Sequence, residues 1–180
     1  MKIKNIFAAV FEKNVLDELL ELLDPKSVRF WGTEGTVNYV KSKGFKTISI
    51  VKGFDFDGRV KSLDRKVFIG ILNDRSKKRH VEEMKRLRME PIDLVIVDLY
   101  APNKKGFPES MDIGGQALIR AAIKNYKNVG VAFDQLSIAD VTRELKNSKS
   151  LSLAFRKRQA KKALEFIAQR TALEASINLR

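Results

Sequence analysis

The sequence predicts an α/β fold, a three-layer sandwich with a mostly parallel central sheet. Two observations favour this fold class. Short runs of apolar and β-branched residues alternate with stretches of helical periodicity along the 180 residues. One of these runs, Pro91–Leu99 (PIDLVIVDL), is nearly continuous in apolar residues, which is typical of a parallel strand covered on both faces.

The expected elements alternate from the N-terminus onward. Strands are expected at residues 3–10, 28–31, 47–51, 91–99 and 128–133. Helices are expected at residues 15–23, 36–43, 76–89, 116–126, 135–146 and 151–177. Residues 66–72 are apolar, but their type of element stays open. Asn14 and Asp112 are expected to cap the helices that follow them, and Gly44 is expected to end the second helix.

The composition limits the chemistry that the chain can perform. It has no cysteine, so it offers neither disulfides nor thiolate chemistry. The only histidine, His80, stands in a charged run, which argues against a histidine metal site or a serine–histidine triad. No stretch approaches the roughly 18 apolar residues of a membrane span, and the N-terminus lacks a signal-peptide cleavage site. We therefore expect a cytoplasmic protein with no membrane partner.

The chain is strongly basic, with a formal net charge of +13 and a pI near 10. Such a charge favours binding to anions, including phosphates, nucleic acid and acidic membrane surfaces. The cations are dispersed, with concentrations at residues 77–79, 85–88 and 156–162. Dispersed cations more often mark a solvated surface, and the chain has few aromatic residues and no nucleic-acid recognition motif. A nucleic-acid partner is therefore not favoured.

A basic segment, Asp57–Leu63 (DGRVKSL), is the first candidate binding element. If it is extended, Arg59 and Lys61 project from the same face, and Ser62 lies beside them. Two cations and a hydroxyl suit a phosphate or another concentrated anion. A solvated charged loop is the competing interpretation of this segment alone.

Two turns that follow expected strands form a second candidate element. Lys13 lies between the first strand and the first helix, at the edge where open α/β sheets bind ligands. Residues 32–36 (GTEGT) place glycine and threonine between a strand and a helix, where N–H groups and hydroxyls can hold a phosphate. Many turns of this type bind nothing, and Glu34 would repel an anion unless it points away.

Three stretches resemble one family of enzymes. Residues 56–63 (FDGRVKSL) resemble its DGRVKTLHP segment, residues 91–100 (PIDLVIVDLY) its PIDLVVVNLYPF strand, and residues 111–125 (MDIGGQALIRAAIKN) its IDIGGPAMLRAAAKN segment. Order and spacing agree, and the similarity covers essentially the whole chain. The chain therefore resembles the inosine monophosphate cyclohydrolase domain, the N-terminal half of a bifunctional purine-biosynthesis protein whose other half is a transformylase.

The resemblance implies a methylglyoxal-synthase-like fold and a hydrolase-class activity. That activity closes the ring of formylaminoimidazole carboxamide ribonucleotide, which gives inosine monophosphate (IMP) and water in the last step of de novo purine biosynthesis. The resemblance implies no organic cofactor, no metal and no transformylase activity. The alternative is a non-catalytic domain of the same fold that senses a nucleotide or a phosphate.

The positions that match the family imply two sets of site residues. The implied substrate-binding residues are Lys13, Thr33, Gly35, Thr36, Arg59, Ser62, Ile113 and Gly114. The implied catalytic residues are Lys61, Tyr100, Asp112 and Lys124. In this hypothesis Asp112 and Tyr100 relay the proton, and the two lysines stabilise negative charge.

Lys124 raises a geometric question. One straight helix over residues 112–124 would separate Asp112 from Lys124 by roughly 18 Å, too far to share a small substrate. Either the Gly114-Gly115 segment is not helical, or Lys124 is only a cation near a helix C-terminus. Asp112 also has a competing role, because an aspartate that caps a helix needs no catalytic function.

The chain departs from the family pattern at Gly32, Glu34, Asp64, Arg65 and Asp98. The family has asparagine at the position of Asp98, so we expect this carboxylate to add negative charge near the site.

We expect residues 1–146 to form the cyclohydrolase-like domain, and residues 147–180 to form a linker and a basic helix packed on it. A purine ribonucleotide is the implied substrate, whereas a homodimer and pairing with a separate transformylase stay open. The apolar residues available to the basic helix are Leu151, Leu153, Phe155, Ala160, Leu164, Ile167 and Ala168.

Overall fold

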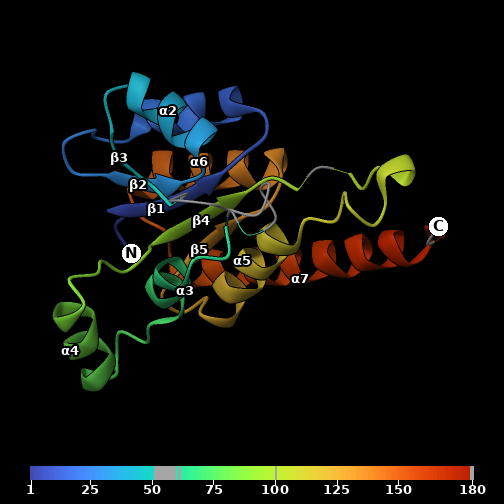
Figure 1. The fold of residues 1–180 in the computed structure, drawn as a ribbon. Coiled ribbons are helices and arrows are strands. Elements are labelled where there is room, and N and C mark those ends of the chain that lie inside the picture. The colour runs from blue at the N-terminus through green and yellow to red at the C-terminus, as the bar shows by residue number, and fades with distance from the viewer. Residues whose placement is uncertain (51–59, 61, 100, 179–180) are drawn as a thin grey trace.

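The computed structural model describes residues 1–50, 60, 62–99 and 101–178. A central parallel sheet carries helices on both faces, so the predicted α/β sandwich is confirmed (Figure 1). The sheet has five strands in the order β3-β2-β1-β4-β5, and each neighbouring pair is parallel. The strands are β1 (Asn5–Ala9), β2 (Arg29–Gly32), β3 (Lys46–Ser49), β4 (Leu94–Val97) and β5 (Gly130–Ala132).

Most helices occupy stretches where helices were expected, whereas those at Arg65–Leu72 and Lys104–Gly106 lie where no helix was predicted. No helix among the described residues is long and apolar enough to cross a membrane. Two are short 3₁₀ helices, η1 (Lys13–Leu16) and η2 (Lys104–Gly106). The others are α1 (Asp17–Leu22), α2 (Glu34–Ser42), α3 (Arg65–Leu72), α4 (Lys78–Arg86), α5 (Ile113–Lys124), α6 (Gln135–Ser148) and α7 (Leu153–Ala175).

The apolar segment at residues 66–72 belongs to helix α3. The helix forms there because Asp64 caps it, with a carboxylate that accepts the N–H groups of Lys66 at 2.8 Å and Val67 at 3.0 Å. Asp64 is one of the departures from the family pattern, and capping gives it a local structural role.

Side chains of the strands alternate between two hydrophobic cores. On β1, Ile6 and Ala8 face the core that α1 and α6 cover, whereas Phe7 faces the core that α3, α5 and α7 cover. On β4, Ile96 faces the first of these cores and Val95 faces the second. All five are fully buried, which explains why β4 is apolar throughout rather than alternating.

The first helix begins differently from the prediction. Asn14 caps no α-helix, so this prediction is wrong: it lies inside η1, which Glu12 precedes in an extended conformation. The chain turns directly after β1, and the tighter 3₁₀ turn takes up the residues that lead into α1. Gly44 does follow the end of α2 with a φ of 90°, as predicted.

Helix α7 packs on α5 and β5. Of the apolar residues available to it, Phe155, Ala160 and Ile167 are buried, whereas Leu153, Leu164 and Ala168 are exposed. The buried stripe also contains an arginine, a glutamine and a glutamate. The buried residues of α7 are Phe155, Arg156, Gln159, Ala160, Ala163, Ile167 and Glu174.

Gly32, the last residue of β2, tests how closely the strands approach at this edge. A Cβ at Gly32 would lie 2.0 Å from the carbonyl oxygen of Ala8 on β1, so the strands would have to shift. We expect Gly32→Ala to lower the free energy of unfolding by about 1–3 kcal/mol, measured by urea denaturation. Gly35→Ala in the same turn is the control, because its Cβ would meet the Lys13 side chain at 3.6 Å, an ordinary contact. Wild-type stability in Gly32→Ala would contradict the close approach.

Candidate functional site

The strand order defines one point at the carboxyl edge of the sheet where a ligand can bind. From β1 the chain goes to β2 and β3 on one side, and later to β4 and β5 on the other (Figure 1). The loops after β1 and β4 therefore diverge, and open parallel sheets bind ligands at such switch points. We refer to this place as the switch point.

Asp98 connects the two strands at the switch point. Its carboxylate follows β4 and accepts the N–H of Phe11 at 2.6 Å and that of Glu12 at 3.4 Å, both in the loop after β1. Burial raises the pKa of Asp98, while these N–H groups and the charge of Lys13 oppose the rise. The sequence indicated only an added negative charge here, whereas the structure shows a carboxylate that holds the loop.

Lys13 and Gly35 come together, as the substrate-binding set requires. The Lys13 Nζ donates to the carbonyl of Phe11 at 2.6 Å and lies 5.6 Å from the centre of the Phe11 ring. The same Nζ would lie 3.9 Å from a Cβ at Gly35, in the first turn of α2. A cation therefore stands beside the N-terminus of a nine-residue helix, where the dipole of the helix also favours an anion.

The two threonines of this turn differ in their surroundings. Thr36 is 1% exposed, and its hydroxyl lies 3.1 Å from the N–H and 3.3 Å from the carbonyl of Val10. Thr36 therefore joins α2 to the end of β1. Thr33 is half-buried at the N-cap of α2, with its Oγ1 3.5 Å from that of Thr36, while Glu34 is exposed.

Asp112 caps helix α5, as predicted. Its Oδ1 accepts the N–H of Gly115 at 2.6 Å. A Cβ at Gly115 would lie 2.5 Å from both the Asp112 Oδ2 and the Leu99 Cδ2, so only glycine lets these side chains pack here. Burial raises the pKa of Asp112, and the N–H of Gly115 and the charge of Arg170 oppose the rise.

The basic segment reaches the start of α5 through Ser62. A Cβ at Gly114 would lie 1.8 Å from the Ser62 Oγ, so the hydroxyl lies directly over this glycine. Ile113 beside it is 56% exposed. The structure thus brings three predicted binding residues, Ser62, Ile113 and Gly114, next to Asp112.

The structure does not bear on three further predicted residues, and it separates a fourth from this arrangement. Arg59, Lys61 and Tyr100 lie outside the described residues, so their site roles stay predictions. Helix α5 is continuous through Gly114 and Gly115, so exposed Lys124 lies at its far end, roughly 18 Å from Asp112 at 1.5 Å per residue. The structure does not bring Lys124 to the other site residues.

Helix α7 contributes two residues near Asp112 that the sequence interpretation missed. Arg170 donates to the carbonyl of Leu99 at 2.9 Å, and Glu174 accepts from the side chain of Gln116 at 2.7 Å. The available signal was spacing, because positions 163, 167, 170 and 174 recur on one helix face. An interpretation that counted only apolar residues could not detect charged members of that face.

Metal binding finds no support in the described part of the chain. No group of three or more His, Cys, Asp or Glu side chains is placed there to hold an ion. The described polar groups around the switch point include cations, hydroxyls, main-chain N–H groups and the carboxylates of Asp98 and Asp112.

Comparisons with known proteins identify relatives of the chain, although no protein-family model matches it. It is 38% identical over 177 residues to the bifunctional purine biosynthesis protein PurH of Acetivibrio thermocellus, covering 91% of this chain and 34% of that protein. PurH of Clostridium acetobutylicum is 35% identical over 178 residues, covering 92% of this chain and 36% of that protein. The chain is therefore similar in sequence to part of PurH.

The similarity to PurH covers nearly all of this chain, which spans about a third of the length of these curated relatives. A crystal structure of ForH has a similar fold, with a TM-score of 0.78 and 26% identity, over 98% of this chain and 99% of that one. The resemblance to a bifunctional purine-biosynthesis protein is therefore confirmed at the level of PurH, while the cyclohydrolase assignment stays a prediction.

The Asp98 contact predicts a local effect on the loop that carries Lys13. We expect Asp98→Ala to accelerate amide hydrogen exchange at Phe11 by about 10- to 100-fold, because a hydrogen bond to a charged group contributes about 1.5–3 kcal/mol. Asp140→Ala is the control, since Asp140 forms its ion pairs on α6 and α7. Equal exchange at Phe11 in wild type and Asp98→Ala would contradict the contact.

The raised pKa of Asp112 predicts how stability changes with pH. Ionising this carboxyl costs more in the folded protein than in the unfolded chain, where the ordinary pKa is 3.8. The stability of wild type relative to Asp112→Asn should therefore be greatest below the ordinary pKa, and should fall as pH rises through the raised folded pKa. Urea unfolding from about pH 3 to about pH 7 measures this difference. A difference that grows with pH would contradict the assignment.

Proposed function

We propose that this chain is an IMP cyclohydrolase, which acts in purine biosynthesis by closing the ring of formylaminoimidazole carboxamide ribonucleotide. The similarity to PurH supports the pathway, and the three matched motifs support the step. The observation that carries the proposal is the arrangement at the switch point. There, Lys13 and Gly35 lie at one helix N-terminus, and Ser62 and Gly114 lie beside Asp112 at another.

The first of these places suits the 5′-phosphate of the ribonucleotide. The Lys13 ammonium supplies a positive charge beside the first turn of α2, and the first N–H groups of a helix have no intrahelical partner. Thr33 at the N-cap adds a hydroxyl. The buried hydroxyl of Thr36 would act indirectly, because its contacts with Val10 fix the start of the helix relative to β1.

The second place suits the reacting groups. In the cyclisation the carboxamide nitrogen bonds to the formyl carbon and loses a proton, and the formyl oxygen takes up negative charge and then a proton. The formamide nitrogen then loses its proton and forms a double bond to the same carbon, and the former formyl oxygen takes up a second proton and leaves as water. Asp112 would accept the proton, because burial raises the pKa of its carboxyl toward the working pH.

Stabilisation of the developing oxyanion would fall to the start of α5. The N–H groups of Ile113 and Gly114 precede the one that Asp112 caps, and they have no intrahelical acceptor. Lys61 and Tyr100 remain candidates for the same step by their match to the family. The proposal does not use Lys124, because α5 holds it at the opposite end of the helix.

The assay for this function follows formation of IMP by absorbance after the purified protein is mixed with the formylated ribonucleotide. We expect turnover by wild type and a fall in kcat of about 100-fold or more in Asp112→Asn, which keeps a capping side chain but removes the base. Asp134→Asn is the matched control, because Asp134 caps α6. We expect Lys13→Gln to raise KM about tenfold, a loss of ~1.4 kcal/mol, with Lys41→Gln on the exposed end of α2 as its control.

The possible results separate the enzyme from the sensor. Turnover that Asp112→Asn loses and Asp134→Asn retains would support the cyclohydrolase and the site. Saturable binding of IMP without turnover by wild type would overturn the enzyme and favour a nucleotide sensor. Absence of both turnover and binding would overturn either function.

A further inference from the structure

Helix α7 crosses the molecule from the amino edge of the sheet to the carboxyl edge. At its start the buried Arg156 donates to the carbonyls of Tyr126 at 3.0 Å and Lys127 at 2.8 Å, and also to that of Leu151. The helix then runs alongside the 12-residue α5 in the opposite direction, and its own 23 residues span about 34 Å (Figure 1). Its last turns therefore reach Leu99, beyond the end of β4.

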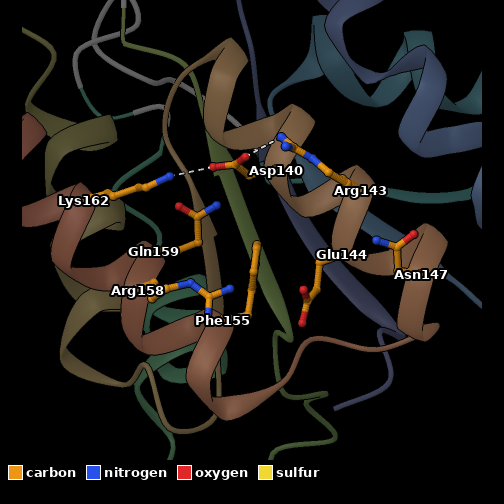
Figure 2. A pocket seen from close by; sticks show the side chains of 8 residues that line it. All are labelled: Asp140, Arg143, Glu144, Asn147, Phe155, Arg158, Gln159 and Lys162. Carbon is orange, nitrogen blue, oxygen red and sulfur yellow. Dashed lines mark hydrogen bonds and ion pairs between the residues drawn. The ribbon is translucent and has the colours of Figure 1, made fainter.

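Contacts in the first half of α7 fix its position. Figure 2 shows Lys162 of α7 and Arg143 of α6 directed at the carboxylate of Asp140 from opposite sides. The two ion pairs measure 2.8 Å and 2.6 Å. Of the two, the Lys162–Asp140 pair joins α7 to α6, whereas Arg143 and Asp140 both belong to α6. The buried Ala163 and Ile167 pack α7 against the rest of the core.

The last turns of α7 are mostly exposed, yet two charged residues turn inward. Glu174 is only 7% exposed and accepts from the Gln116 side chain at 2.7 Å. Arg170, one turn earlier, donates from Nη2 to the Leu99 carbonyl at 2.9 Å, and its guanidinium lies 5.8 Å from the centre of the Phe166 ring. Glu174 is buried and Arg170 is half-buried in this otherwise exposed stretch, and taking charged groups out of water is costly unless their contacts compensate.

Leu99 and Gln116, to which Arg170 and Glu174 are hydrogen bonded, both lie beside Asp112. Leu99 immediately precedes Tyr100 in the sequence, and the Leu99 side chain packs over Gly115, to which Asp112 is hydrogen bonded. Leu99, Asp112, Gln116, Arg170 and Glu174 line one tight cleft. The charge of Arg170 also lowers the pKa of Asp112 against the effect of burial. The end of α7 therefore touches the main chain, the cap and the first turns that build the site.

We propose that Arg170 and Glu174 are positioning residues of the candidate site. Arg170 fixes the chain at Leu99 and places a positive charge near Asp112, while Glu174 holds Gln116 and with it the N-terminal part of α5. The inference rests on the proposed function, since positioning is measured through turnover. It makes the C-terminal helix part of the catalytic unit rather than a connector.

The test compares two stacked arginines on the same helix. Arg170 lies 5.8 Å from the Phe166 ring and Arg158 lies 5.7 Å from the Phe155 ring, but only Arg170 reaches the switch point. We expect Arg170→Gln to lower kcat about 10- to 100-fold while KM changes less than about threefold, because small misplacements cost rate more than binding. Arg158→Gln should retain wild-type kcat and KM.

Two further variants keep the test decisive if Arg170→Gln folds poorly. Arg170→Lys preserves the charge and one donor, so it should recover part of the kcat that Arg170→Gln loses. Glu174→Gln should lower kcat in the same direction with little effect on KM, because it weakens the bond from Gln116. Wild-type kcat in both Arg170→Gln and Glu174→Gln, each with a wild-type melting curve, would overturn the inference. If Arg170→Gln does not fold, wild-type kcat in Glu174→Gln would overturn the role of Glu174.

A second readout separates this inference from the proposed function. The pKa of Asp112 is measured by carboxyl carbon NMR in wild type and in Arg170→Gln. The charged groups that face Asp112 among the described residues are Arg170 and Glu174, both on α7. Removing the cation should raise the pKa of Asp112, whether or not the protein turns over the formylated ribonucleotide.

The results can be read independently of each other. An inactive wild type in which Arg170→Gln raises the pKa of Asp112 would overturn the cyclohydrolase but support the coupling between α7 and the site. An unchanged pKa of Asp112 together with unchanged kcat would overturn the positioning role while the cyclohydrolase stands.

Discussion

The two aspartates that flank β4 hold the main chain of β1, and the geometry of the switch point depends on them. Asp93, before the strand, accepts the N–H groups of Lys4 at 2.7 Å and Asn5 at 2.9 Å. Asp98, after the strand, accepts the N–H of Phe11 at 2.6 Å. The central pair of strands is therefore held at both ends by hydrogen bonds to charged groups, which are roughly twice as strong as neutral ones. Because the strand order reverses between these two strands, the same contacts set the distance between the loop after β1 and the chain that leads to α5.

The two ends of β4 differ in how their charges are compensated. At the amino end, Asp93 forms an ion pair with Arg75 at 2.9 Å. At the carboxyl end, Asp98 and Asp112 accept main-chain N–H groups, and each feels a cation at longer range, Lys13 or Arg170. A carboxylate without a direct ion pair keeps a pKa that burial can raise. Burial therefore raises the pKa values of Asp98 and Asp112, and the proposed proton transfer at Asp112 would use that rise.

Much of the fold could be predicted from the sequence, because local patterns determine it. Alternating strand and helix patterns gave the order of elements, and Asp112 and Gly44 marked helix ends correctly. Contacts between distant segments could not be predicted in this way. The role of Asp98 depends on the loop after β1, which lies more than 80 positions away in the sequence. The true inner face of α7 depends on charged side chains that find partners on β4 and α5, and hydrophobic periodicity does not record such partners.

The two adjacent glycines of α5 show why the family motif was nevertheless informative. Gly114 leaves room for the Ser62 hydroxyl, and Gly115 leaves room for the Leu99 and Asp112 side chains. Each glycine thus records a close approach by a different part of the chain: the basic segment on one side, the end of β4 on the other. The motif therefore marks the place where three segments meet: the start of α5, the segment that carries Ser62, and the end of β4. Substituting either glycine would separate segments that the proposed chemistry needs together, because a Cβ at Gly114 would meet Ser62 and a Cβ at Gly115 would meet Asp112 and Leu99.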